Sequence, residues 1–234
     1  TGFKRSQIDF QDLLYLKMRE AGTEIASGIN SPGGLEVGSG VRPASTVKVF
    51  TAGELQNTSR PLDVAITGEG FLQISMPDGS TKYTRDGALQ MNANGQLVNT
   101  SGYAIEPSIT IPSDAVSISI EKNGGVNVTN STGAVSVVGT LQMARFQNQA
   151  GLSSEGDNLY AQTEASGTAM TGTPGENGLG SILSGFLEKS NVQMVSELVN
   201  LITAQRAYEI NSRAIKAGDD MLQTANAIGN GKQG

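Results

Sequence analysis

The stretch Leu198–Ile215, LVNLITAQRAYEINSRAI, has the apolar spacing of a helix and lies close to the end of the chain. Two lines of mostly apolar residues recur there every seven positions: Leu201, Tyr208, Ile215 and Leu222 in one line, and Ala207, Ala214, Met221 and Ile228 in the other. A repeat of seven is typical of a helix that packs along a partner helix. We therefore predict a long C-terminal helix whose first free N–H groups are capped by Ser190 or Asn191.

The length of this helix bears on what covers its apolar residues. From Ser190 it can run for about 40 residues, roughly 55–60 Å at a rise of 1.5 Å per residue. That is longer than a small β domain is wide, so a partner helix is favoured over the chain's own β domain. Glu209 lies three residues after Arg206 and four before Arg213. These charges can pair on a solvated face, or they can set the register between helices in an assembly.

The segment from Val47 to Phe146 has a different period, because apolar and polar residues alternate in short runs such as LDVAI, FLQISM, VSISI and GVNVT. The hairpin signals PDGS, RDG and NANG lie between the runs. This pattern is typical of an antiparallel sandwich or a barrel-like β domain. Residues 151–181 are rich in Gly, Ser and Thr, and we expect them to run along the outside. The predicted fold class is mainly β, with an antiparallel β domain and a long terminal α-helix of the coiled-coil type.

The first 50 residues have a mixed pattern. Phe10, Leu13, Leu14 and Lys17 follow helical spacing, which predicts a short helix over Gln7–Arg19. The next residues, EAGTEIASGINSPGGLEVGSG, indicate an extended excursion or a long hairpin. We therefore divide the chain into a segment 1–50 with an extended arm at about 15–38, a β domain at 51–185 and the C-terminal helix domain at 186–234.

Charge and composition exclude several classes of function. The 234-residue chain has a formal net charge of −6, which argues against nucleic acid as a partner because phosphate binding needs a basic surface. It has no Cys and no His, so disulfides, thiolate metal sites and catalysis by a His base are absent. No apolar run reaches the length that spans a bilayer. The opening TGFKRS is neither a start nor a signal peptide, so we expect the chain to be cut or its true N-terminus to lie upstream.

The motif AITGEGFLQI places Gly68 and Gly70 after a predicted strand, as in a dinucleotide-binding loop. That fingerprint needs a third Gly and then a helix. Here Gln73 and another strand follow, so a sharp bend between strands is the favoured interpretation. Asp86 and Gly87 form an Asp-Gly pair, which is more typical of a turn than of a metal ligand. No pattern indicates a catalytic group, a metal or a cofactor, and we expect the protein not to be an enzyme.

Three segments together resemble the axial proteins of the bacterial flagellum. They are TGFKR near the start, PLDVAITGEGFLQI with YTRDGALQMNANGQLVNTSGY in the β domain, and SNVQMVSELVNLITAQRAYEINSRAI at the C-terminus. They occur in the family's order, and the resemblance covers nearly the whole chain. The stretch Tyr15–Gly38, followed by SGVRP, is similar to an insertion of the family's distal rod type. The proximal rod and hook types are the alternatives.

The resemblance implies a structural function in the flagellar basal body. Subunits of the family pass through the flagellar type III export apparatus without a cleaved signal. They polymerise helically into a rigid drive shaft that spans periplasm and peptidoglycan and transmits torque from motor to hook. The implied partners are other copies of the chain, proximal rod, hook and ring (bushing) proteins, and the export apparatus. A non-catalytic cell-wall-binding module is the alternative from another class.

The resemblance also implies where subunits touch. On the helix, the expected contact residues are Met194, Leu198, Leu201, Tyr208, Ile210, Ala214, Ile215, Met221 and Leu222. On the arm, Ile25, Ile29, Pro32 and Leu35 are expected to reach neighbouring subunits and keep the shaft straight. The family's N-terminal helix is missing from this sequence, so we expect that the chain does not polymerise as given.

Overall fold

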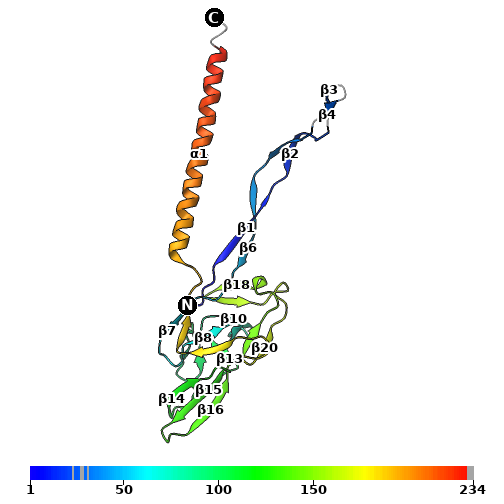
Figure 1. Cartoon of the computed structure of the whole chain (residues 1–234). Coiled ribbons are helices and arrows are strands. Elements are labelled where there is room, and N and C mark those ends of the chain that lie inside the picture. Colours follow the sequence, from blue (N-terminus) through cyan, green and yellow to red (C-terminus); the bar gives the residue numbers. More distant parts are fainter. Residues whose placement is uncertain (23, 27–28, 31, 231–234) are drawn as a thin grey trace. The chain divides into compact units, whose positions relative to one another are not determined.

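The computed structural model describes residues 1–22, 24–26, 29–30 and 32–230, with the side chains of residues 1–22 and 32–225. The chain forms two compact units, Thr1–Asn191 and Val192–Gly234. The first unit consists of antiparallel β-structure, and the described part of the second is one long α-helix (Figure 1). The predicted fold class is therefore confirmed.

The largest sheet of the first unit has nine strands. Seven follow the order β11-β12-β13-β9-β10-β19-β18, and β17 pairs with both β9 and β20. These strands are β9 (Phe71–Ser75), β10 (Thr81–Thr84), β11 (Gln90–Met91), β12 (Leu97–Val98), β13 (Ala104–Glu106), β17 (Met143–Arg145), β18 (Ser153–Gly156), β19 (Leu159–Ala161) and β20 (Met170–Gly172). The predicted turns PDGS and NANG join β9 to β10 and β11 to β12.

Smaller sheets complete the β domain. β14 (Ala115–Ile120), β15 (Gly125–Asn130) and β16 (Val135–Thr140) form a three-stranded sheet, green in Figure 1. β8 (Val64–Thr67) pairs with β21 (Ser181–Ser184), and β7 (Leu55–Asn57) pairs with β22 (Phe186–Glu188). The last strands of the domain therefore return to pair with the first ones.

Two clusters of buried side chains form the core. The larger is aliphatic and includes Ile66, Leu72 and Ile74. The smaller is aromatic: the rings of Tyr83 and Phe146 meet edge to face with centroids 4.7 Å apart. Phe50 packs against this aromatic cluster, so it fastens the chain segment before β7 to the domain.

The expectation that residues 151–181 run along the outside is wrong. They contain β18, β19 and β20, and they bury Leu152, Leu159, Tyr160 and Leu179. These apolar residues are widely spaced between Gly-, Ser- and Thr-rich turns. The Gly-, Ser- and Thr-rich composition therefore predicted a loop where three short strands join the main sheet.

The helix predicted over Gln7–Arg19 is also wrong, because β1 (Ser6–Asp12) and β2 (Tyr15–Arg19) occupy these residues. β1 pairs with β6 (Val41–Lys48), β2 with β5 (Leu35–Gly38), and β3 (Glu24–Ala26) with β4 (Ile29–Asn30). Distant strand partners have overridden the local helical spacing. We name this long two-stranded hairpin, residues 6–48, the arm. It extends further along the chain than the arm expected at 15–38.

The second unit contains α1 (Met194–Asn230), which at 1.5 Å per residue is roughly 55 Å long. The predicted cap at Ser190 or Asn191 is wrong, because the helix begins at Met194 and the side chain of Asn191 is bound elsewhere. Within the described residues, no helix combines the length and the apolar character needed to cross a membrane.

Candidate functional site

The apolar side chains of α1 are exposed in this chain. Met194, Tyr208 and Met221 have exposed fractions of 77%, 76% and 72%. The other expected contact residues of the helix are exposed as well: Leu198, Leu201, Ile210, Ala214, Ile215 and Leu222. Large continuous apolar surfaces of this kind mark interaction sites. Burying one large apolar side chain contributes about 1.5–3 kcal/mol, so this surface can drive association with a partner helix.

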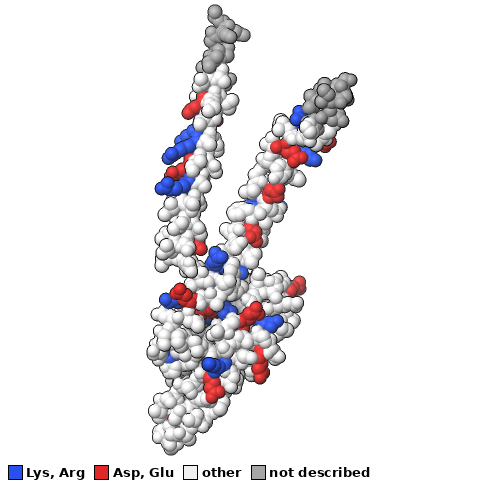
Figure 2. Space-filling view, viewed as in Figure 1, with Lys and Arg blue, Asp and Glu red and all other residues white. Residues whose placement is uncertain are grey.

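The charges of α1 lie mainly in one stripe. Arg206, Glu209, Arg213, Lys216 and Asp220 follow one another at spacings of three and four residues, which places them on one side of the helix. Figure 2 shows charged side chains gathered over part of α1, while most of its visible surface is uncharged. Arg213 Nη2 lies 3.8 Å from Glu209 Oε2, and both side chains are exposed. In the described part of the chain, Arg206 does not form the predicted pair with Glu209.

The described side chains of the arm are exposed, except for the half-buried Val47 and Lys48 at its base. Leu14, Phe10 and Met18 have exposed fractions of 89%, 64% and 66%. Of the four expected contact residues, Pro32 and Leu35 are exposed. The side chains of Ile25 and Ile29 lie outside the described residues, although their backbone belongs to β3 and β4. The arm is thus a second apolar surface without a cover from its own chain.

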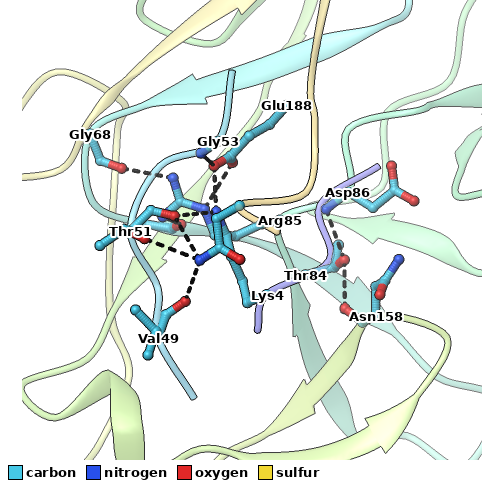
Figure 3. A network of polar contacts seen from close by, with 12 residues as sticks. Lys4, Val49, Thr51, Gly53, Gly68, Thr84, Arg85, Asp86, Asn158 and Glu188 are labelled. Carbon is cyan, nitrogen blue, oxygen red and sulfur yellow. Dashed lines mark hydrogen bonds and ion pairs between the residues drawn. The ribbon is translucent and has the colours of Figure 1, made fainter. Parts of the chain in front are cut away.

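A buried polar cluster lies at the base of the arm. Its three charged side chains, Lys4, Arg85 and Glu188, have exposed fractions of 0%, 2% and 1%. Figure 3 shows that they converge from three separate segments: the start of the chain, the residue after β10, and the end of β22. Charged side chains are almost never buried this fully unless they are paired, and here each is paired. We call these three residues, together with Asn191, the junction.

The carboxylate of Glu188 joins the segments of the junction. Oε1 accepts hydrogen bonds from Lys4 Nζ at 2.5 Å and from the Gly53 N–H at 2.9 Å. Oε2 accepts a bond from Arg85 Nε at 3.1 Å. Lys4 Nζ also donates to the Thr51 carbonyl at 2.8 Å. One buried carboxylate therefore holds the start of the chain, the segment after β6 and the main sheet.

Asn191 adds a second tie beside Glu188. Its Oδ1 accepts the Arg5 N–H at 2.9 Å, and its Nδ2 donates to the Val49 carbonyl at 2.7 Å. The backbone contributes as well, because the Gly2 N–H donates to the Glu188 carbonyl at 2.9 Å. Asn191 thus bridges the residue before β1 and the residue after β6, which are the two ends of the arm.

The ionisation of the junction follows from its geometry. Burial alone would raise the pKa of Glu188, but Arg85, the hydrogen bonds from Lys4 and Gly53, and the charge of Lys4 together hold this pKa below its ordinary value. Burial lowers the pKa of Lys4. The hydrogen bond and the charge of Glu188 offset this only in part, and repulsion from Arg85 adds a smaller lowering. The two directions are compatible because one carboxylate faces two cations. We assign the carboxylate as ionised at neutral pH.

The glycine motifs of the β domain support the junction. Gly68 and Gly70 connect β8 to β9 with φ of 111° and 138°, a left-handed region that favours glycine. Their carbonyls accept hydrogen bonds from Arg85 Nη2 at 2.9 Å and Nη1 at 3.2 Å. The bend between strands therefore positions Arg85, and no helix follows the bend.

The Asp86–Gly87 turn follows Arg85 directly. Asp86 Oδ1 accepts bonds from the Thr1 hydroxyl at 2.8 Å and the Ala88 N–H at 3.1 Å. The Gly87 carbonyl accepts the Val64 N–H at 2.9 Å. A side chain at Gly87 would place its Cβ 1.8 Å from the Val64 carbonyl oxygen, so the close approach of the turn to β8 requires glycine.

Sequence reasoning did not identify Lys4, Arg85, Glu188 or Asn191 as a group. Lys4 and Arg85 stand inside two of the motifs that carry the family resemblance, TGFKR and YTRDGALQ, but a single charge in a short motif does not indicate its partner. Lys4 and Glu188 are separated by 184 positions in the chain. Their pairing is visible only in the folded protein.

Comparison with known proteins gives matches over both units. The family model for the flagellar hook protein FlgE/F/G D1 domain matches residues 65–128. The model for the flagellar basal body rod FlgEFG protein C-terminal region matches residues 183–228. The first match covers the bend and the turn beside Arg85, and the second covers Glu188, Asn191 and most of α1.

Several relatives match over nearly the whole chain. A flagellar basal-body rod protein FlgG of Buchnera aphidicola (subspecies Schizaphis graminum) is 49% identical over 224 residues, covering 95% of this chain and 86% of the relative. The protein of the same name from Caulobacter vibrioides is 44% identical, with 97% and 87% covered. That from Bacillus subtilis is 35% identical, with 95% and 85% covered.

Proposed function

Because the chain belongs to the FlgG family of flagellar basal-body rod proteins and is a structural subunit of the flagellar rod, we propose that it polymerises helically into a rigid distal rod that transmits torque from motor to hook. The exposed apolar surface of α1 carries this proposal. The relatives matched over almost the whole chain and described above are named as rod proteins, so the hook alternative is not favoured.

The proposed contact made by α1 is helix against helix. Its apolar residues lie in seven-residue lines, and its charges lie mainly in a separate stripe. A helix whose neighbours cover the apolar lines and leave the charged stripe in water gains the burial energy and keeps the charges hydrated. The proposed partners of α1 are helices of other copies of the chain and the N-terminal helix expected from the family resemblance.

The proposed contact made by the arm is with neighbouring subunits. Its apolar side chains include Leu14, Leu16, Met18 and Leu35, all more than half exposed. Residues of this kind on a thin two-stranded hairpin have no core of their own to enter. A neighbour that covers them would gain apolar burial and would also restrain bending between subunits.

The remaining parts of the proposal concern place and partners. We propose that the rod subunit crosses periplasm and peptidoglycan, reaches its site through the flagellar export apparatus without a cleaved signal, and meets proximal rod, hook and ring proteins there. The support is family membership and the names of the relatives. No catalytic step belongs to this function.

The experiment that tests the proposal is rod assembly in a flagellated bacterium from which the gene of its own FlgG protein has been deleted. This sequence replaces the matching part of the host's own rod protein, either unchanged, with Ile215→Glu, or with Gln223→Glu. Ile215 lies in an apolar line of α1, whereas Gln223 continues the charged stripe and is exposed. Both variants gain the same charge on the same helix.

Isolated basal bodies are then examined by electron microscopy, and swimming is scored. We expect distal rods and swimming with the unchanged gene and with Gln223→Glu, and neither with Ile215→Glu. Normal rods with Ile215→Glu would contradict the proposed helix contact. If the unchanged chain forms no rods but binds isolated peptidoglycan as a soluble protein, the result would favour the cell-wall-binding alternative.

A further inference from the structure

We propose that the junction is the fastening through which force passes between the β domain and the two exposed parts, the arm and α1. This inference rests on the proposed function only in taking the arm and α1 as the parts that neighbours hold. The fastening itself is a property of one folded chain. It assigns a mechanical role to Lys4, Arg85, Glu188 and Asn191.

The junction lies where the arm and α1 leave the β domain along the chain. The arm begins with β1 at Ser6 and ends with β6 at Lys48, while α1 begins at Met194. The junction binds the residues next to each of these points: Lys4 and Arg5 before β1, Val49 to Gly53 after β6, and Glu188 to Asn191 before α1. Force carried along the backbone from the arm or from α1 therefore reaches these residues before it reaches the main sheet.

The hydrogen bonds of the junction at Glu188 are made to a buried ionised group. Hydrogen bonds to ionised groups are roughly twice as strong as neutral ones, and those at Glu188 are shielded from water because the carboxylate is buried. Water cannot replace such a bond until the segments have already moved apart. Glu188 accepts from Lys4, Gly53 and Arg85, so the start of the chain, the segment after β6 and the main sheet separate from it together.

The segment after β6 is held at several points. It is held by hydrogen bonds of Lys4, Glu188 and Asn191 and by the ring of Phe50 in the aromatic cluster. Beyond Arg85 lie the aliphatic and aromatic clusters that pack around β9 and β10. The polar junction is therefore the boundary between a self-supporting domain and the segments that leave it.

Two variants with matched controls test the fastening. Lys4→Met removes one cation but keeps an unbranched side chain of similar length, and Glu188 keeps Arg85 and Gly53 as partners. Its control is Lys82→Met, which breaks the Lys82–Glu155 pair on the surface of the same domain. Asn191→Ala is the second variant. Its control is Asn130→Ala, because Asn130 Oδ1 accepts the Thr132 and Ala134 N–H groups in the turn after β15.

The measurement is single-molecule pulling in optical tweezers. The natural chain has no cysteine, so Thr46→Cys in β6 and Met194→Cys at the start of α1 give two unique attachment points. Both positions are exposed, and force between them loads the contact of residues 49–53 with residues 188–191. We expect a first small rupture before the β domain unfolds. At a given force this rupture is about tenfold or more faster in Lys4→Met and in Asn191→Ala than in their controls. Lys4→Met loses the buried bond to Glu188, and Asn191→Ala loses the bonds to Arg5 and Val49 that bridge the two ends of the arm.

Hydrogen exchange of the unloaded chain supplies a second readout. The Val49 N–H donates to the Arg5 carbonyl at the base of the arm, and the Lys189 N–H donates to the Glu54 carbonyl. In Lys4→Met the increase in the exchange rates of these two N–H groups is expected to be about tenfold larger than any increase at the amides of β9 and β10. A uniform increase over the whole domain would overturn the proposal, because the cluster would then be an ordinary part of the core.

Equal rupture rates in Lys4→Met and Lys82→Met, in a folded protein, would also overturn it. If Lys4→Met does not fold, the comparison of Asn191→Ala with Asn130→Ala decides in the same way. None of these measurements requires assembly. If the variants rupture faster than their controls but the unchanged chain forms no rods, only the proposed function is contradicted. If the unchanged chain forms rods but the variants rupture no faster than their controls, only this inference is contradicted.

Discussion

At the scale of single residues, the carboxylate of Glu188 has the widest effect. It accepts hydrogen bonds from Lys4, Gly53 and Arg85, which are 184, 135 and 103 positions away in the chain. A single buried ionised group can organise several segments because each hydrogen bond lowers the cost of burying its charge. The same property makes the site sensitive to loss of any one partner.

The lowered pKa of Glu188 predicts a specific response to acid. A carboxyl group whose pKa is lower in the folded than in the unfolded chain stabilises the fold above its ordinary pKa, 4.5. That stability is lost as the pH falls through the folded pKa. At pH 7, Glu188→Gln should reduce the free energy of unfolding by about 3–5 kcal/mol, because Lys4 and Arg85 stay buried without their anion.

Thermal melts of the parent and of Glu188→Gln from pH 7 to pH 3 check this prediction. The gap between their melting temperatures is expected to shrink as the pH falls below about 4.5. Glu155→Gln, at an exposed carboxylate, is the control and should follow the parent throughout. A gap that stays constant down to pH 3 would contradict the lowered pKa of Glu188, because it would mean that folding leaves this pKa unchanged.

Gly87 gives a second prediction at this scale. Because its Cβ would lie 1.8 Å from the Val64 carbonyl oxygen, Gly87→Ala must displace β8 or the turn. We expect a loss of about 3 kcal/mol or more in the free energy of unfolding. Gly133→Ala is the comparison: its φ is 81° but its surroundings are open, so it should lose only about 1–2 kcal/mol. Urea titration measures both, and equal losses would contradict the predicted clash.

At the scale of elements, α1 and the arm differ in how they are specified. The stability of α1 is local, since its hydrogen bonds join residues four apart, and its pattern can be identified within a single window of sequence. The hairpin of the arm depends on pairs such as Phe10 with Pro43 and Tyr15 with Gly38. Proline cannot donate to a sheet, and here it stands at a bulge opposite Phe10.

Gly218 offers a test of the helix itself. It lies inside α1 with no atom near its possible Cβ, so Gly218→Ala should stabilise the helix by about 1 kcal/mol through intrinsic propensity alone. Circular dichroism at the helix band should show higher helix content and later melting. Ala217→Gly, at the neighbouring exposed position, should do the opposite. Unchanged helix content in both would mean that α1 is already stabilised by packing in the dissolved protein.

At the scale of the whole molecule, the chain combines a self-sufficient β domain with two apolar parts that its own core does not cover. The β domain closes on itself because β21 and β22 return to β8 and β7. The exposed parts carry most of the large exposed apolar side chains of the described residues. This division is consistent with the function proposed above, in which neighbouring copies cover the exposed parts and make the rod stiff.

Shortening the arm tests its share in that stiffness. Residues 14–39 are replaced by Asn-Gly, a turn that can close β1 on β6. The β domain should melt as in the parent, since the arm contributes little to its core. Rods assembled from this variant should bend more, measured as a shorter persistence length in electron micrographs. Rods of unchanged stiffness would remove the function proposed for the arm.

The sequence by itself determined the elements whose signals are local. The turns PDGS and NANG, the alternating strands of the β domain, the bend at Gly68 and Gly70, and the long helix each depend on residues close together in the chain. The family resemblance depended on such local motifs too, and the relatives confirm it. Local backbone preferences and apolar periods are enough for these features.

Only the tertiary structure decided the features that depend on distant partners. The strands of the arm formed where the local pattern favoured a helix, because β5 and β6 supply the missing hydrogen bonds. The strands within residues 151–181 formed where composition predicted a loop, because β10 and β17 accept them into the main sheet. The pairing of Lys4 and Arg85 with Glu188 in the junction has no local signal, because the partners are more than 100 positions apart. A buried charge is stable only beside its partners, and the fold alone brings those partners together.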